Sequence, residues 1–276
     1  MPIRTYYWQS RIEPKTKLFV RKLKNKKPSM YFKYGNCGDI FNEHLIRYIY
    51  GIDSINVKDS ENRLLCVGSI ASQINNGDII CGIGVKDYII PDKKRDVEIY
   101  GCRGPISLSV FQEKGYKINS DAFLYDPGLL IKDLLKKDYS EKGKVIFIPH
   151  YRERFKYGKK IMGNIDVIDI DNRFDYIARK IQEASLVYSS SLHGIIFTHA
   201  LNRPCVYVKP QTVESELKFE DYFLSVSNTY KKPLDSIYEY RNHLKPDSPL
   251  DIDVKRKDFI FPEKSLLDKK NILIKD

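Results

Sequence analysis

No run of eighteen apolar residues occurs in this chain, so a membrane-spanning helix is not expected. The N-terminal segment also lacks the apolar core of a signal peptide. The five cysteines are scattered at positions 37, 66, 81, 102 and 205, and no pair of them has the spacing of zinc ligands. These absences predict a cytoplasmic protein with reduced thiols.

Motifs that would assign a function at once are also missing. Gly35 and Gly38 lack the third glycine of a dinucleotide-binding fingerprint, and no Lys-Ser/Thr of a P-loop follows them. No nucleophile elbow occurs, and no set of His, Asp or Glu has metal-ligand spacing. The net charge is +11, yet no signature of a nucleic-acid-binding module accompanies it. We therefore expect no cofactor, no metal and no nucleic acid, and relate the charge to a lysine-rich surface, an anionic membrane or an anionic substrate.

What the chain does have is enough length and enough apolar residues for two α/β domains. It has 276 residues, of which 42% are apolar. Buried strands and amphipathic helices alternate along it, and glycine-rich turns follow the strands. In the first half we expect strands at 30–34, 64–67, 78–84 and 97–100, and helices at 40–50, 106–114 and 126–135.

The charged segment 136–143 ends in a glycine and is the best linker in the sequence. A second α/β series follows it, with expected strands at 144–148, 165–170, 186–188 and 205–208, helices at 171–184 and 192–201, and shorter late helices at 217–223, 234–243 and 263–270. Two such series predict two Rossmann-like domains that face a cleft, with boundaries 1–138 and 139–276. We expect the C-terminal tail to pack back on the first domain.

The most informative stretch is 184–209, which has the strand–turn–helix–strand pattern of a βαβ crossover. His193 falls in the first turn of its helix, after Ser191 and before Gly194. The first turn of a helix attracts anions because its N–H groups are free and the dipole is positive there. A structural histidine is the alternative reading, but the serine-rich turn at a strand end favours an anion site.

Other polar residues also follow expected strands, each with a plain alternative. Asp39 either caps a helix or presents a carboxylate to a sugar hydroxyl. Arg103 is either a surface residue or a bidentate ligand of an anion. Asp126 has the position of a helix cap, His150 follows a strand end, and Lys218 alone is a weak signal.

Together these short motifs resemble the polysaccharide pyruvyltransferase family, in that family's order and over residues 30–226. The matching segments are Asn36-x-Gly38-Asp39, Gly68-Ser69, Arg103-Gly-Pro-x-Ser107, Asp126-Pro127, Pro149-His150, Ser191-Leu-His193-Gly194 and Lys218-Phe-x-Asp221. The resemblance implies two Rossmann-like domains, as in type B glycosyltransferases. It also implies transfer of a pyruvyl group from phosphoenolpyruvate to a sugar of a bacterial surface polysaccharide or its lipid-linked precursor, forming a ketal. Members with an Arg-Leu-His turn use it to hold phosphoenolpyruvate, whereas this chain has Ser191 in place of the arginine.

The resulting hypothesis assigns a role to each candidate residue. His193 is expected to be a general acid or donor ligand with a pKa near the working pH, and Asp39 is expected to orient or deprotonate the acceptor hydroxyl. The remaining expectations are donor binding by Arg103, Ser191, Gly194 and Lys218, and acceptor binding by Asn36, Asp126 and His150.

Three other functions fit parts of the sequence. A glycosyltransferase with a nucleotide-sugar donor would also need cations at a helix N-terminus. A non-catalytic carbohydrate-binding protein could keep the fold, and the charge alone suggests a nucleic-acid binder. The basic surface and the abundant tyrosine and phenylalanine further predict peripheral association with the inner face of an anionic membrane.

Overall fold

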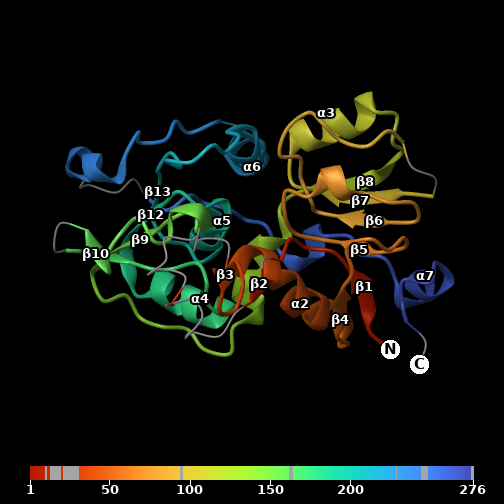
Figure 1. Cartoon of the computed structure of the whole chain (residues 1–276), viewed down its shortest axis with the longest axis horizontal. Helices are drawn as coiled ribbons and strands as arrows, with labels where there is room; N and C mark the ends of the chain where they lie inside the picture. The colour runs from red at the N-terminus through yellow and green to blue at the C-terminus, as the bar shows by residue number, and fades with distance from the viewer. Residues whose placement is uncertain are drawn as a thin grey trace.

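The structure is a computed structural model. It describes residues 1–9, 11–12, 20, 31–93, 96–161, 164–227, 229–243 and 248–274. Met30, where the first expected strand begins, lies outside these ranges. The chain folds into two lobes, each built on a sheet (Figure 1).

The first sheet has six parallel strands in the order β4-β1-β5-β6-β7-β8. These strands are β1 (Ile3–Thr5), β4 (Ser54–Asn56), β5 (Leu64–Leu65), β6 (Ile79–Cys81), β7 (Glu98–Cys102) and β8 (Ile118–Leu124). The sequence predicts β5, β6 and β7 but misses β1, β4 and β8. The parallel order places the carboxyl ends of these strands, with their glycine-rich turns, along one edge.

The second sheet has the order β10-β11-β9-β12-β13, and all neighbours are parallel except β10 and β11. Its strands are β9 (Lys144–Ile148), β10 (Lys160–Ile161), β11 (Ile165–Val167), β12 (Ala184–Ser189) and β13 (Cys205–Tyr207). The predicted βαβ crossover is confirmed, because Val187 pairs with Cys205 in parallel register and α5 (Leu192–Ala200) connects their strands. The α/β class is therefore confirmed, with two Rossmann-like sheets.

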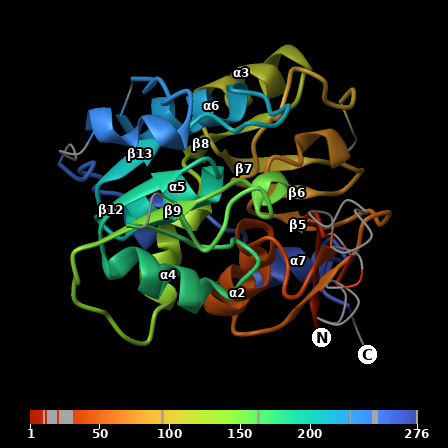
Figure 2. The ribbon, with the colours of Figure 1, turned by 60° about the vertical axis from the view of Figure 1, so that its left-hand side comes forward.

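The helices lie on both sheets and between them (Figure 2). Helix α2 (Cys37–Tyr50) ends where the sequence predicts, because Gly51 adopts the left-handed conformation and donates its N–H to the Arg47 carbonyl. The other α-helices are α3 (Pro105–Glu113), α4 (Phe174–Gln182), α6 (Leu217–Ser227) and α7 (Lys264–Lys269). Short 3₁₀-helices are η2 (Ala71–Gln73), η3 (Pro127–Leu134), η4 (Tyr151–Glu153), η5 (Ile237–His243) and η6 (Arg256–Asp258).

Apolar packing joins the two lobes. Phe41 of α2 contacts both Phe174 of α4 and Phe197 of α5, with ring centroids 6.0 and 5.3 Å apart. Phe41 and Phe197 belong to one buried cluster that also includes Ile3 of the first sheet and Val187 of the second, and the partly buried Phe174 packs against it. Because burial of apolar area is the main stabilising force, this shared core fixes α2 between the sheets.

Asp171 corrects one expectation about this junction. It was expected to cap α4, but the residue at that cap position is Arg173. The Asp171 carboxylate instead accepts the backbone N–H groups of Lys33, Tyr34 and Gly35 at 2.8 to 3.1 Å. A residue of the second half therefore holds the loop that leads into α2. The strand just before this loop, β3 (Tyr31–Phe32), pairs in parallel with β2 (Arg11–Ile12).

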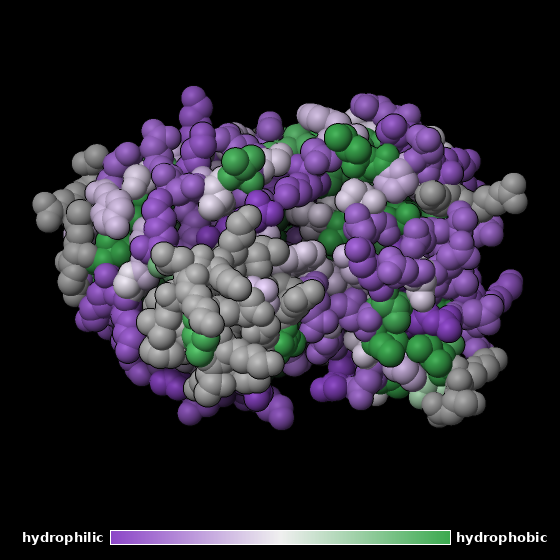
Figure 3. Space-filling view, viewed as in Figure 1, coloured by the Kyte–Doolittle hydropathy of each residue, from purple (hydrophilic) through white to green (hydrophobic). Residues whose placement is uncertain are grey.

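The last described residues run beside the first strand. Arg4 donates its N–H to Ile272, and Ile274 donates to Pro2. The N-terminus and the last described residues therefore lie together at one end of the first lobe (Figure 1). The face seen in Figure 3 is mainly hydrophilic, with small separate apolar areas. No helix within the described ranges is long and apolar enough to cross a membrane.

Candidate active site

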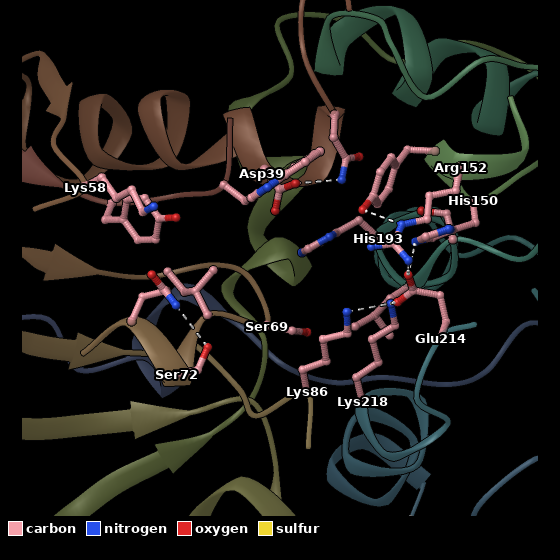
Figure 4. A pocket seen from close by; sticks show the side chains of 18 residues that line it. Asp39, Lys58, Ser69, Ser72, Lys86, His150, Arg152, His193, Glu214 and Lys218 are labelled. Carbon is pink, nitrogen blue, oxygen red and sulfur yellow. Dashed lines mark hydrogen bonds and ion pairs between the residues drawn. The ribbon is translucent and has the colours of Figure 1, made fainter. Parts of the chain in front are cut away.

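A cleft of about 360 Å³ opens where the carboxyl ends of strands from both sheets meet. Figure 4 shows its polar side chains converging from the two lobes. This is the position at which open α/β sheets bind ligands. The polar and aromatic residues that line it include Tyr6, Trp8, Asn36, Asp39, Lys58, Ser69, Lys86, His150, Tyr151, Arg152, Ser191, His193, Glu214 and Lys218.

His193 lies in the first turn of α5 with its ring against the start of α2. A Cβ atom added to Gly38 would stand 2.1 Å from His193 Nδ1, so only glycine leaves room for this ring. Burial, together with Arg103 and Lys218, lowers the pKa of His193 to about 3. The expectation of a pKa near the working pH is therefore wrong for this cleft, and the imidazole is neutral.

Asp39 has the near-neutral pKa that was expected of the histidine. Burial raises the pKa of its carboxyl to about 7, although Asn36 and Lys218 act in the opposite direction. Asn36 Nδ2 donates to Asp39 Oδ2 at 2.7 Å. The alternative reading as a helix cap is not found, since Asn36 is the cap residue of α2 and no side chain caps it within the described structure.

Asp126 stands behind His193 and outside the cleft lining. One carboxylate oxygen caps η3 by accepting the Gly128 N–H at 2.8 Å. The other, Oδ2, is 3.9 Å from His193 Nε2, and neither of these two atoms has a hydrogen-bond partner among the described residues. Burial raises the pKa of Asp126 to about 6. This placement corrects the expected acceptor contact, because Asp126 faces the imidazole.

A cluster of cations surrounds Glu214 at one end of the cleft (Figure 4). Its carboxylate is 2.8 Å from Lys218 Nζ, 3.3 Å from Arg152 Nη1 and 3.9 Å from Lys86 Nζ. His150 Nε2 lies 3.7 Å away, but burial lowers the pKa of His150 to about 3, so this imidazole adds no charge. Three cations against one carboxylate leave this end positive, as an anionic ligand requires.

Arg103 lies beneath the cleft wall rather than in it. Its guanidinium is fully buried and donates to Asp221 Oδ2 at 3.0 Å, to Ser69 Oγ at 2.6 Å and to the Val85 carbonyl at 2.6 Å. Asp221 also accepts the N–H and the hydroxyl of Ser107. The expected donor contact is corrected accordingly, because Arg103 is committed to holding Ser69 and α6 in place.

Ser191 and Gly194 shape the start of α5 in different ways. Ser191 lines the cleft and caps the helix, with its hydroxyl oxygen 3.5 Å from the Gly194 N–H. Gly194 packs inward, where an added Cβ would stand 2.3 Å from Ser189 Oγ. Gly194 is therefore needed for packing and does not line the cleft, which corrects its expected role in donor binding.

Several cleft residues were not predicted from the sequence. Lys86, Arg152 and Glu214 complete the charged end, and Trp8 and Tyr151 add aromatic rings. Two weak signals existed in the sequence, since Arg152 closely follows the strand end at His150 and Glu214 lies four residues before Lys218. In the part of the chain that the structure describes, no group of three His, Cys, Asp or Glu residues could hold a metal ion.

Comparisons with known proteins identify the family of this chain. The sequence profile of the polysaccharide pyruvyl transferase family matches residues 6–212. An uncharacterized protein of Acanthamoeba polyphaga mimivirus is 32% identical over 183 residues, which cover 60% of this chain and 62% of that relative, less than two thirds of its length. A crystal structure of an uncharacterized protein from Klebsiella pneumoniae aligns over 80% of this chain and 98% of its own, with 16% identity and a TM-score of 0.37.

Proposed function

Because this chain belongs to the polysaccharide pyruvyl transferase family, we propose that its cleft transfers the pyruvyl group of phosphoenolpyruvate to a saccharide and forms a pyruvate ketal. One observation carries the proposal: buried acid–base groups with shifted pKa values stand beside a cluster of cations. Groups whose environments move their pKa values apart are typical of acid–base sites.

The charged end of the cleft suits the donor. Phosphoenolpyruvate carries a phosphate and a carboxylate, and Lys86, Arg152 and Lys218 offer three cations around Glu214. The first turn of α5 adds backbone N–H groups and the positive end of its dipole. These cations supply the charge that an arginine at position 191 would otherwise bring.

The reaction needs one proton at C3 of the donor and loss of a proton from an acceptor hydroxyl. When C3 is protonated, C2 becomes electrophilic and the sugar oxygen forms a bond to it. A second hydroxyl of the same sugar then attacks C2, the C2–O bond to phosphate breaks, and phosphate leaves with the electron pair and the second proton. Both hydroxyl protons are thus accounted for, one on C3 and one on phosphate.

The pKa values support a scheme in which Asp39 is the acid and His193 is the base. At neutral pH a substantial share of Asp39 is protonated, and the anions of a bound donor raise that share. His193 is neutral and can accept the hydroxyl proton, and Asp126 at 3.9 Å stabilises the imidazolium that forms. This reverses the roles expected from the sequence.

The test is phosphate release from phosphoenolpyruvate in the presence of candidate saccharides. We expect His193→Gln and Asp39→Asn each to lower kcat by about a hundredfold or more. We also expect kcat/KM to fall as pH rises through about 7, because Asp39 then loses its proton. Donor affinity measured at each pH separates this effect from ionisation of the donor itself. A rise of kcat/KM through the same range would make Asp39 the base.

A thermal-shift comparison of phosphoenolpyruvate with nucleotide sugars tests the donor independently of turnover. A ligand that binds only the folded state raises its melting temperature. Stabilisation by phosphoenolpyruvate is the expected result. Stabilisation only by nucleotide sugars would contradict the proposal and indicate a glycosyltransferase.

We further propose that the acceptor is part of a bacterial surface polysaccharide or its lipid-linked precursor, and that the basic surface brings the protein to an anionic membrane. The sequence supports this through its net charge of +11. Co-sedimentation with anionic vesicles at low salt, compared with neutral vesicles, tests the association. Equal and negligible binding to both would refute it.

A further inference from the structure

The cleft has an aromatic surface to which the donor chemistry gives no role. Trp8 follows β1 of the first sheet, and Tyr151 follows β9 of the second. Their ring centroids are 4.9 Å apart, and the buried ring of Phe32 meets the indole edge-on at 6.1 Å. Trp8 and Tyr151 are both partly exposed. Two lobes thus build one supported aromatic surface that remains open to the cleft.

We propose that Trp8 and Tyr151 form the stacking surface for the sugar ring of the acceptor. A pyranose has an apolar face of C–H groups and a rim of hydroxyls. Aromatic rings bind the apolar face, and a few fixed polar groups orient the rim. A cleft that combines rings with side-chain hydroxyl and amide groups meets both needs. This inference rests on the proposed function, because it names the second substrate's place in the same cleft.

Polar groups for the hydroxyl rim line the same cleft as the aromatic surface. Asn36 Oδ1 is buried and has no hydrogen-bond partner within the described residues, so it can accept a hydrogen bond from a sugar hydroxyl. Its amide nitrogen is already bonded to Asp39, which fixes the direction of the free oxygen. Ser72 and Gln73 of η2 bring a hydroxyl and a carboxamide to the same cleft. A hydroxyl held by Asn36 would lie next to the proposed acid.

The aromatic surface adjoins the charged end of the cleft. In Figure 4, Lys58 and Ser72 lie at one end and Arg152, Glu214 and Lys218 at the other, with Asp39 and His193 between them. Tyr151 borders the charged end, because Arg152 Nε donates to its hydroxyl at 2.9 Å. A sugar on the aromatic surface would therefore lie next to the proposed donor cations, within reach of the donor.

Trp8 is the only tryptophan of the chain, so its fluorescence reports directly on this surface. We would titrate the protein with methyl glycosides of galactose, glucose, mannose and N-acetylmannosamine, with and without phosphoenolpyruvate. The expected result is a saturable change in Trp8 emission with at least one glycoside. If no glycoside changes the emission in either condition, the inference is overturned.

Calorimetric titration then measures the glycoside and phosphoenolpyruvate affinities of variants that lack one of the rings. We expect Trp8→Leu and Tyr151→Leu each to weaken glycoside binding by about tenfold, while Trp8→Leu leaves phosphoenolpyruvate affinity within about twofold. Tyr176→Leu, an exposed tyrosine on α4, is the matched control and should change neither. Unchanged glycoside affinity in both cleft variants, each shown to be folded by its thermal transition, would refute the stacking role. If the wild-type protein neither binds phosphoenolpyruvate nor turns it over, the proposed function is refuted, while the glycoside titration still tests the stacking surface by itself.

Discussion

Two buried polar clusters border the cleft, and they differ in how completely they are bonded. Around Arg103 the polar groups have hydrogen-bond partners: the guanidinium donates to Asp221, to Ser69 and to the Val85 carbonyl. Around His193, the Nε2 atom and Asp126 Oδ2 face each other at 3.9 Å without a hydrogen-bond partner in the described ranges. Burial alone therefore does not mark a catalytic group here. The difference between the two clusters lies in unused hydrogen-bonding capacity.

The difference has an energetic meaning. A saturated buried network adds rigidity, and this one fixes α6 to the first sheet through Asp221. An incompletely bonded buried group costs stability. Such a cost is consistent with a group kept for chemistry, because the missing partner can be a substrate.

The largest expected effect is on the saturated cluster. Arg103→Met leaves Asp221 buried without its cation, and removing one partner of a buried ion pair costs about 3–5 kcal/mol. We expect the free energy of unfolding, measured by urea denaturation, to fall by that amount. Arg63→Met is a matched control, because Arg63 forms a fully buried pair with Asp78 at 2.7 Å. Comparable losses in both variants are expected; an unchanged stability of Arg103→Met would remove the distinction between the clusters.

The next effect has the opposite sign and concerns Asp39, the buried carboxyl group of the cleft. In the folded protein the pKa of Asp39 is raised from 3.8 to about 7. Between these values the unfolded chain releases a proton that the folded chain keeps, so wild-type stability declines as pH rises. Asp39→Asn removes this decline, and its gain should grow from pH 4 to about 7 and reach at most about 4 kcal/mol.

Urea denaturation of wild type and Asp39→Asn at several pH values measures this gain. A stabilised variant that has lost turnover would identify Asp39 as a group kept for function at the expense of stability. A variant that is less stable than wild type at pH 8 would contradict the raised pKa.

Local patterns explain which parts of the fold could be predicted. Helix α2 and its end at Gly51, and the crossover β12–α5–β13, depend on periodicity and turn residues that lie close together in sequence. Strand β1 has three residues and pairs with Ser54 and Leu64 far along the chain. No short window contains the information that makes Ile3–Thr5 a central strand.

The same limit applies to the site. Polar residues at strand ends could be predicted to converge, because parallel strands end at one edge. Which partner each residue meets depends on packing between distant segments. Arg103 pairs with Asp221, and Asp171 holds the loop before α2, so neither role follows from its own motif. The pKa values of Asp39 and His193 also result from burial, which their sequence neighbours do not determine.

Gly38→Ala tests whether a shift of the His193 ring lowers turnover while the stability of the fold changes little. The new Cβ would stand 2.1 Å from the imidazole, so the ring must move. We expect turnover to fall by about a hundredfold, similar to loss of an acid–base group, while the better helix propensity of alanine offsets about 1 kcal/mol of the strain. Gly158→Ala is the control, because its nearest contact is 3.8 Å away. Full activity of Gly38→Ala would show that the imidazole position is not critical.

The smallest expected effect is a difference between Lys86 and Lys218 in their contributions to donor affinity. The Lys86 side chain is 43% exposed and lies 3.9 Å from Glu214, whereas that of Lys218 is 9% exposed and lies at 2.8 Å. Exposed charges contribute about 0–1 kcal/mol and are screened by salt. We expect Lys86→Gln to weaken phosphoenolpyruvate binding by about threefold at low salt and by less as salt rises. Lys218→Gln should weaken it more and with little salt dependence, because a buried charge is screened less; the reverse order in calorimetric titrations would place the donor's anions nearer Lys86.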